Sequence, residues 1–348
     1  MTSLAEQIRP VTVGVDTHRD FHVVGVIDAR GVEIAAQSFP AEAAGYAALE
    51  SWAQSLGPVA CFGVEGTGSW GAGLARHLVG RGQAVVEVNR SDRSERRRVG
   101  KDDTIDAYAA ARAAQSGRAR AVPKTQDGPV EALRALKVAR NGAVKAKTQA
   151  ANQLKNLVAT APDALRAELR GLSTLNLARR CAASRPRPGA DPLNATRRAL
   201  RSIARRWLDL DHEATELYAE IKTLTDQTAP GLVAMTGIGP DIAAQLLLTA
   251  GDNPHRLHTE AGFARLCGVA PIPATSGQTI KVRLHRGGDR AANAALHRAV
   301  IVRLNHHPET KAYMQRRLAE GKPKLEIIRC LKRYLARRVY HQLLALDI

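Results

Sequence analysis

Short apolar stretches bounded by polar and turn residues recur in the first ninety positions. The stretches VTVGVD and FHVVGVID are rich in β-branched residues, and DARG between FHVVGV and VEIAAQSF marks a hairpin turn. The pattern predicts strands at 11–16, 21–28, 32–39, 59–65 and 84–88 and helices at about 42–56, 69–81 and 103–116. A meander of three strands followed by alternating helices and strands predicts a ribonuclease-H-like α/β domain.

From residue 130 onward the apolar spacing becomes that of helices. Residues 130–178 and about 195–226 are rich in Lys and Arg and are separated by a Pro- and Gly-rich loop at 184–194. Two long helices around a loop predict an antiparallel, coiled-coil arm that serves as a spacer or for dimerisation. We therefore expect three domains, 1–125 (catalytic α/β), 126–229 (helical arm) and 230–348 (helical C-terminal domain).

The chain is strongly basic, which indicates a polyanionic partner. Its 348 residues are 45% hydrophobic and 4% aromatic and carry a net charge of +18. From residue 281 to 348 there are 16 Lys and Arg against 5 Asp and Glu. Nucleic acid is the commonest partner of such a surface. No apolar run approaches the ~20 residues of a membrane-spanning helix, and MTSLAEQIRP lacks a signal-peptide core, so we expect a cytoplasmic protein without membrane contact.

Four carboxylates occupy positions that a single site could bring together. Asp16 ends the first predicted strand and Glu65 the fourth, while Asp103 and Asp106 lie three residues apart at the start of a helix. Converging carboxylates raise one another's pKa unless a cation is bound. Mg²⁺ prefers such oxygen ligands, and two ions would clamp the attacking and leaving oxygens of a phosphodiester. We predict a two-metal Mg²⁺ site here, with Mn²⁺ able to substitute.

Each of these carboxylates also has a plain structural explanation. An isolated Asp at a strand end is usually a turn residue, and acidic residues in a first helical turn favour the helix dipole. Asp102 is expected to cap its helix. The four cysteines form no CxxC pair, so neither a zinc site nor a disulfide framework is indicated. The histidines checked as metal ligands form no zinc-like pair and are expected to be ordinary surface or core residues: His18, His22, His77, His285 and His297.

The segment TGIGPDIAAQLL places Gly237 and Gly239 immediately before an apolar helix. Free backbone N–H groups at a helix start bind phosphate, and glycines allow it to approach closely. The segment is similar to the second half of a helix-hairpin-helix, a motif that binds the DNA backbone. An ordinary loop-to-helix turn is the alternative, but in so basic a chain we favour phosphate binding.

With these motifs identified, the chain resembles the DEDD transposases of the insertion-sequence group guided by a bridge RNA, which are related to Piv-type DNA invertases. The motifs GVDTH, GVEGTGSWG and KDDTIDA correspond to RuvC-like catalytic motifs. At the other end, TGIGPDIAAQLL, FARLCGVAPIPATSGQT and RGGDRAANAALHRAVIVRL match the second transposase domain. The resemblance covers about 11–120 and 230–340. KDD departs from the usual small polar residue before the first helix aspartate, although the register to Asp106 is kept.

The resemblance implies a role for individual residues. Asp16, Glu65, Asp103 and Asp106 would be the metal-binding tetrad. Ser276 falls at the position of the nucleophilic serine, where the sequence alone would predict a turn residue. Four basic residues follow closely and are expected to hold a scissile phosphate: Lys281, Arg283, Arg286 and Arg290.

The resemblance also implies a function, site-specific DNA recombination that excises and inserts a mobile element. It implies a bridge RNA that reads DNA by base pairing, assembly as a dimer or tetramer, and a bacterial, nucleoid-associated location. Three alternatives stay open: a Holliday-junction resolvase using the same carboxylates, an RNA-independent invertase, and an inactive nucleic-acid-binding remnant.

Overall fold

The computed structural model describes residues 9–88, 102–189, 191–277 and 282–346. The chain forms two compact units, which are described separately. The first runs to Asp127 and includes Gly251–His258, and the second contains Gly128–Ala250 and the residues from Thr259 onward. The arm and the helical C-terminal region thus share one unit, while the division into three domains remains a prediction.

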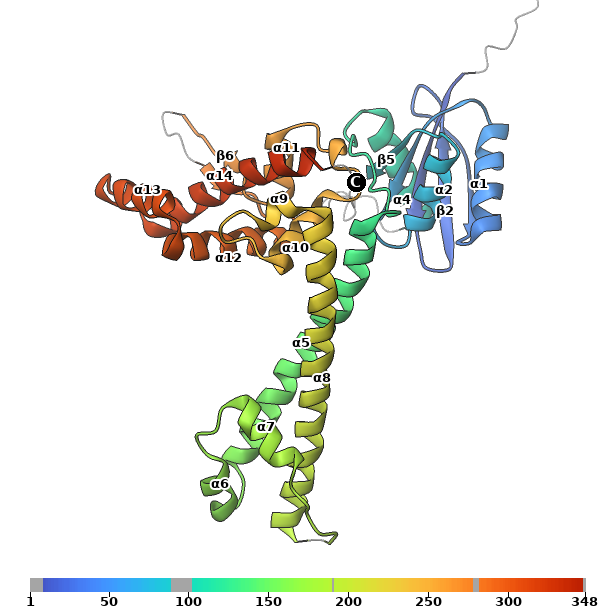
Figure 1. Ribbon diagram of the computed structural model, residues 1–348. Coiled ribbons are helices and arrows are strands. Elements are labelled where there is room, and N and C mark those ends of the chain that lie inside the picture. Colours follow the sequence, from blue (N-terminus) through green and yellow to red (C-terminus); the bar gives the residue numbers. More distant parts are fainter. Residues whose placement is uncertain (1–8, 89–101, 190, 278–281, 347–348) are drawn as a thin grey trace, which may run out of the picture. The chain divides into compact units, whose positions relative to one another are not determined.

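The first unit contains a five-stranded mixed sheet with the strand order β3-β2-β1-β4-β5 (Figure 1). Its strands are β1 (Val11–Thr17), β2 (Phe21–Ile27), β3 (Glu33–Pro40), β4 (Val59–Glu65) and β5 (Val85–Val88). Strands β1, β2 and β3 pair antiparallel, whereas β4 is parallel to both β1 and β5. The predicted mixed α/β architecture is confirmed.

Helices cover both faces of this sheet. On one face, α1 (Ala43–Ser55) and α2 (Ala72–Gly80) bury Leu49 and Leu74 against valines of β1 and β2 and Phe62 of β4. The other face is covered by α4 (Asp103–Gln115), which contacts β1, β2 and β4. Helix α2 begins three residues later than the sequence predicts, because Glu65 to Gly71 form a turn in which Gly66 has φ of +65°.

A row of glycines lies under α4. Gly14 of β1 pairs with Gly25 of β2 on one side and with Gly63 of β4 on the other. A Cβ atom on Gly14 would collide with the backbone of α4 at Ala107, and a Cβ on Gly63 would lie 2.8 Å from the carbonyl oxygen of Ala110. Because interiors are close-packed, the absence of three side chains lets the helix backbone lie directly on the sheet.

The arm consists of α5 (Pro129–Ala159) and α8 (Pro192–Thr228), which pack along each other (Figure 1). The helical periodicity of residues 130–178 predicts one long helix, but α5 ends before Pro162. The ring of a proline disfavours helical backbone angles at the residue that precedes it. Two short helices follow, α6 (Asp163–Leu169) and α7 (Thr174–Ala182). They enclose an apolar core with Leu154 and Trp207.

The C-terminal region is helical with one short hairpin. Its elements are α9 (Pro230–Val233), α10 (Pro240–Ala250), α11 (Glu260–Leu266), β6 (Pro271–Pro273), β7 (Val282–Leu284), α12 (Arg290–His306), α13 (Pro308–Ala319) and α14 (Lys324–Leu344). The 3₁₀ turn Pro254–Arg256, which precedes α11 in the chain, belongs to the first unit. Among the described residues, no helix combines the length and hydrophobicity needed to cross a bilayer.

The glycine row generates the first prediction. Gly14→Ala is expected to destabilise the first unit by more than about 3 kcal/mol, because backbone of α4, rather than a flexible side chain, blocks the added methyl group. Urea unfolding followed by circular dichroism measures the change. Gly80→Ala is the matched control, since nothing lies within 4 Å of its Cβ position. Equal stability of the two variants would contradict the close approach of α4.

Candidate metal centre

Asp16 and Glu65 lie at the ends of adjacent parallel strands. In β1 and β4, Val15 pairs with Val64, and both valines point into the core beneath α1 and α2. Side chains alternate along a strand, so Asp16 and Glu65 share the opposite face with the glycine row. That face is covered by α4. The ends of the two strands are also joined by a hydrogen bond, which the hydroxyl of Thr17 donates to the carbonyl oxygen of Glu65 at 2.9 Å.

Helix α4 directs Asp103 and Asp106 toward the same face. Residues 103, 106, 107, 110 and 111 follow the spacing of one helical face, and the alanines among them are buried. Asp106 is buried with 8% of its surface exposed, while Asp103 is partly exposed. Asp102 accepts a hydrogen bond from the backbone N–H of Thr104 at 2.8 Å, which confirms the predicted helix cap.

His18 joins these carboxylates, which the sequence did not predict. Its Nε2 atom lies 3.2 Å from Oδ2 of Asp16 and 3.4 Å from Oδ2 of Asp103. The expectation of an ordinary histidine fails because the partner carboxylate comes from a helix more than eighty residues away in the chain. The only signal in the sequence is the Asp-x-His spacing at a strand end. We call Asp16, His18, Asp103 and Asp106 the acidic cluster.

The acidic cluster makes ionised Asp16 unfavourable without a cation. Burial raises the pKa of Asp16, the positive charge of His18 lowers it, and the carboxylates of Asp106 and Asp103 raise it again, with a net rise. Asp16 is therefore coupled to both helix aspartates through space. The negative charges of Asp103 and Asp106 repel the ionised carboxylate of buried Asp16, and a bound cation would offset this repulsion.

The residues of the cluster have the donor chemistry of a divalent metal site. Ligand atoms of Asp16, His18 and Asp103 all lie within 4.8 Å of one another. Nε2 of His18 is buried and, despite its short distances to both carboxylates, has no partner in hydrogen-bond geometry among the described residues. Carboxylate oxygens suit Mg²⁺ and Mn²⁺, and an imidazole nitrogen shifts the preference toward Mn²⁺. The residues therefore fit a divalent cation. Glu65 lies on the neighbouring strand, outside this group of three.

Ser276 and the basic residues predicted around it belong to the second unit. Ser276 is exposed and lies three residues after β6. Arg283 is exposed on β7 and pairs in register with Ile272, while Arg286 and Arg290 are exposed before and at the start of α12. The fourth predicted residue, Lys281, lies outside the described residues. No hydrogen bond of the Ser276 hydroxyl is found within the described part of the chain.

The two glycines before α10 have different surroundings. Gly237 has φ of +84°, and a Cβ there would lie 2.7 Å from the carbonyl oxygen of Ala299 on α12, so packing alone requires glycine. At Gly239 nothing lies within 4 Å. Phosphate binding by these glycines remains a prediction.

The first turn of α10 already carries a negative charge. Asp241 accepts from Lys137 at 2.7 Å and from Arg140 at 2.9 Å, both on α5, and Arg298 of α12 lies 3.4 Å away. Burial raises the pKa of Asp241, but the hydrogen bond and charges of these cations outweigh burial and lower it overall. The carboxylate thus fixes α10 to the arm and to α12.

Comparisons with known proteins agree with this organisation. Residues 13–161 match a model of IS110-type DEDD transposases, described as "Transposase". Residues 230–315 match a second model, described as "Transposase IS116/IS110/IS902 family". Both models describe transposases, so these two matches place the chain in the transposase class, and the mixed α/β unit and helical C-terminal region fit that class. Within that class, the chain belongs to the IS110 family.

One curated relative supports the same family. It is the "Insertion element IS110 uncharacterized 43.6 kDa protein" of Streptomyces coelicolor, which is 32% identical over 124 residues. The match includes 35% of this chain and 30% of the relative, so the chain spans less than a third of that protein's length.

The raised pKa of Asp16 predicts a pH-dependent stability. The folded metal-free protein binds a proton at Asp16 more tightly than the unfolded chain does, so stability falls as the pH rises through this pKa. In EDTA at neutral pH, Asp16→Asn should therefore raise the melting temperature by about 2–4 °C. The gain should vanish at low pH, where Asp16 is protonated. Calorimetry at both pH values checks this, and a lower melting temperature for the variant at neutral pH would contradict it.

His18 predicts a metal preference. In His18→Gln, the Mn²⁺ concentration needed for a given rise in melting temperature should increase about tenfold. The Mg²⁺ concentration needed should increase less, because Mn²⁺ gains more from an imidazole ligand. Melting temperature is measured against the concentration of each metal. His212→Gln, which changes an exposed histidine of α8, is the control. Equal weakening for both ions would show that His18 only positions the carboxylates.

Proposed function

We propose that this protein is a transposase that acts as a site-specific DNA recombinase, cutting phosphodiester bonds and transferring strands to excise and insert a mobile element. The observation that carries the proposal is the acidic cluster, in which Asp16, Asp103 and a histidine approach within 4.8 Å. Membership of the IS110 family supports DNA as the substrate.

The proposed metal ligands are Asp16, Glu65, Asp103 and Asp106, with His18 as a further donor. A bound Mg²⁺ or Mn²⁺ would supply Lewis-acid stabilisation of charge on phosphate oxygens. The carboxylates would hold such a cation at the C-terminal ends of β1 and β4, near the start of α4. Burial of Asp16 and Asp106 fixes the position of these oxygens, because buried side chains have little rotational freedom.

Ser276 is the proposed nucleophile. Its Oγ forms a bond to the scissile phosphorus while the bond from phosphorus to one deoxyribose oxygen breaks, and the proton of the serine ends on the released sugar hydroxyl. The phosphoserine ester conserves the bond energy, so attack by a DNA hydroxyl rejoins strands without ATP. Exposure of Ser276 on a hairpin suits attack on a large substrate. Arg283, Arg286 and Arg290 are proposed to hold the phosphate, together with Lys281.

Partners and assembly follow from the same proposal. A structured bridge RNA would read target and donor DNA by base pairing, and the protein would supply backbone contacts and chemistry. The protein would act as a dimer or tetramer, associated with the bacterial nucleoid, with the arm at 126–229 as a contact between protomers. The net charge of +18 supports nucleic-acid partners.

A covalent-adduct assay tests this proposal. The protein is incubated with Mg²⁺, DNA spanning an element junction and RNA from the flanking region of the element, and protein–DNA species are resolved on a denaturing gel. We expect an adduct with the unmodified protein. Ser276→Ala and Asp16→Asn should each reduce it at least about a hundredfold, since removal of a nucleophile or metal ligand removes most of the rate.

Ser51→Ala, at an exposed serine of α1, is the matched control and should form the adduct normally. Cleavage without an adduct, unaffected by Ser276→Ala, would replace the proposal with a resolvase-type nuclease that uses the same carboxylates. An adduct that needs no RNA would indicate an RNA-independent invertase. Failure of the unmodified protein to cut any substrate would indicate an inactive remnant.

A further inference from the structure

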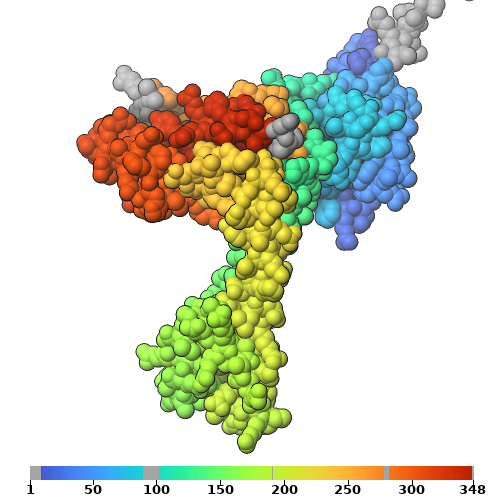
Figure 2. All heavy atoms as spheres, in the orientation of Figure 1, coloured from blue at the N-terminus to red at the C-terminus, as the bar shows by residue number. Residues whose placement is uncertain are grey.

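The far end of the arm is a folded module rather than a simple turn. Helices α6 and α7 pack against the ends of α5 and α8 around buried leucines, Cys181 and Trp207. In the space-filling view, the segment around α6 and α7 forms a broad lobe at the end of the helix pair (Figure 2). We call residues 163–206 the arm tip. It lies between the two segments that match transposase family models.

The arm tip has a strongly biased charge. It contains three carboxylates and no lysine, aromatic residue or histidine. Its eleven arginines are Arg166, Arg170, Arg179, Arg180, Arg185, Arg187, Arg197, Arg198, Arg201, Arg205 and Arg206. Exclusive use of arginine is notable because the guanidinium group binds phosphate in bidentate geometry, whereas lysine acts as a point charge.

The charge changes sign along α8. From residue 192 to 208 this helix has five arginines and no carboxylate, and from 209 to 226 it has six carboxylates and one lysine. The acidic half faces α5 at least in part, since Lys147 of α5 pairs with Asp211 at 2.8 Å. Positive charge is therefore concentrated at the tip and does not simply follow from a basic composition.

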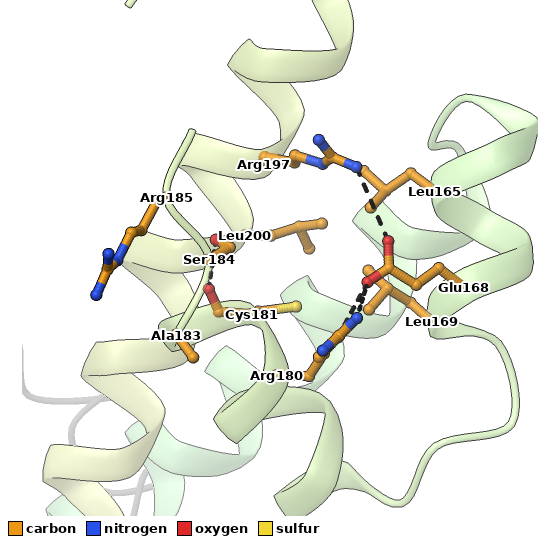
Figure 3. Close-up of a pocket in the computed structure, with 10 residues that line it drawn as sticks. All are labelled: Leu165, Glu168, Leu169, Arg180, Cys181, Ala183, Ser184, Arg185, Arg197 and Leu200. Carbon is orange, nitrogen blue, oxygen red and sulfur yellow. Dashed lines mark hydrogen bonds and ion pairs between the residues drawn. The ribbon is translucent and has the colours of Figure 1, made fainter. Parts of the chain in front are cut away.

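The carboxylates of the arm tip already have partners. Glu168 lies 2.8 Å from Arg180 and 3.8 Å from Arg197 (Figure 3). Asp163 pairs with Arg166, and Asp191 caps α8 by accepting from Asn194. Within the described part of the chain, five arginines have side chains with no acceptor and are exposed: Arg170, Arg179, Arg185, Arg187 and Arg205.

Two of these arginines lie on a loop that is held in place. Arg185 and Arg187 alternate with Pro186 and Pro188, whose rings restrict the backbone. The guanidinium of Arg198 donates to the carbonyl oxygens of Arg187 and Gly189 at 2.8 and 2.9 Å. In Figure 3, the guanidinium of Arg185, one of the residues that line the adjacent pocket, points away from Leu165, Leu169 and Leu200. These contacts hold the backbone that carries both arginines, while their side chains stay exposed.

The pocket beside this loop does not explain the arginines. Its volume is about 300 Å³. Glu168 and its two arginine partners line it together with apolar side chains. Burial raises the pKa of the Cys181 thiol to about 11, so this cysteine is a neutral packing residue. The cations that lack partners lie on the exposed surface of the tip.

We propose that the arm tip binds the phosphate backbone of duplex DNA. Guanidinium groups without carboxylate partners supply the attraction. Residues 163–206 contain no aromatic residue and the neighbouring Trp207 is buried, which argues against a platform that stacks single-stranded bases. The choice of DNA as the duplex rests on the proposed function. The surface would hold DNA independently of the acidic cluster, and it gives the arm a binding role in addition to any contact between protomers.

Binding of the full-length protein to a 40-base-pair DNA duplex in EDTA, across a range of salt concentrations, tests this proposal. We expect Arg179→Gln, Arg185→Gln and Arg187→Gln together to weaken binding about tenfold or more. The slope of log affinity against log salt should fall by about 2 to 3, since each phosphate contact contributes about 0.9. Circular dichroism shows whether this triple variant is folded. The corresponding Arg→Lys triple should keep most of the slope with part of the affinity.

The matched control replaces Arg30, Arg76 and Arg118 by Gln, which removes the same charge from exposed positions of the first unit. Equal effects of the two triple variants would overturn the proposal. Loss of binding to an RNA hairpin but not to DNA would also overturn it and assign the surface to RNA. An unmodified protein that binds DNA through the tip but forms no covalent adduct would sink the proposed function alone.

Discussion

The close contact between α4 and the sheet is the interaction on which the acidic cluster depends. Gly14, Gly25 and Gly63 form a row across three paired strands, and the helix places its alanines on that row. Asp103 and Asp106 extend the same helical face beyond the alanines. Any side chain in the row would lift the helix and carry both aspartates away from Asp16. The geometry of the site is therefore determined by the residues that are missing from the sheet as much as by the carboxylates.

This arrangement creates an electrostatic conflict within the metal-free protein. A buried Asp16 with two carboxylates nearby has a raised pKa, and its ionised form opposes folding. His18 offsets part of that repulsion only when it is protonated. Functional sites commonly keep such unfavourable interactions because ligand binding removes them. A bound cation would supply the missing positive charge, and metal binding would then be linked to the stability of the first unit.

The β-branched stretches and the turn residues were sufficient to predict the five strands of the large sheet, the helix that carries Asp103 and Asp106, and the cap at Asp102, but not the short hairpin of β6 and β7. The glycine row was not predicted, although the three glycines stand in the similar segments GVD, GVI and GVE near the ends of their strands, because only strand register aligns them. His18 was missed since its partner Asp103 is distant in sequence. Helical periodicity also continues past Pro162, so it could not show that α6 and α7 fold back into a lobe.

Segregation of charge resolves the apparent contradiction between a chain of net charge +18 and a site made of carboxylates. A divalent cation and a polyanion need surfaces of opposite sign, and mixing the two would cancel both fields. Within α8, arginines and carboxylates occupy separate halves, and the tip carboxylates are already paired or capping. In the first unit, Asp16 and the aspartates of α4 are gathered at one sheet edge. Charge is distributed by segment, so each part of the chain can attract its own ligand.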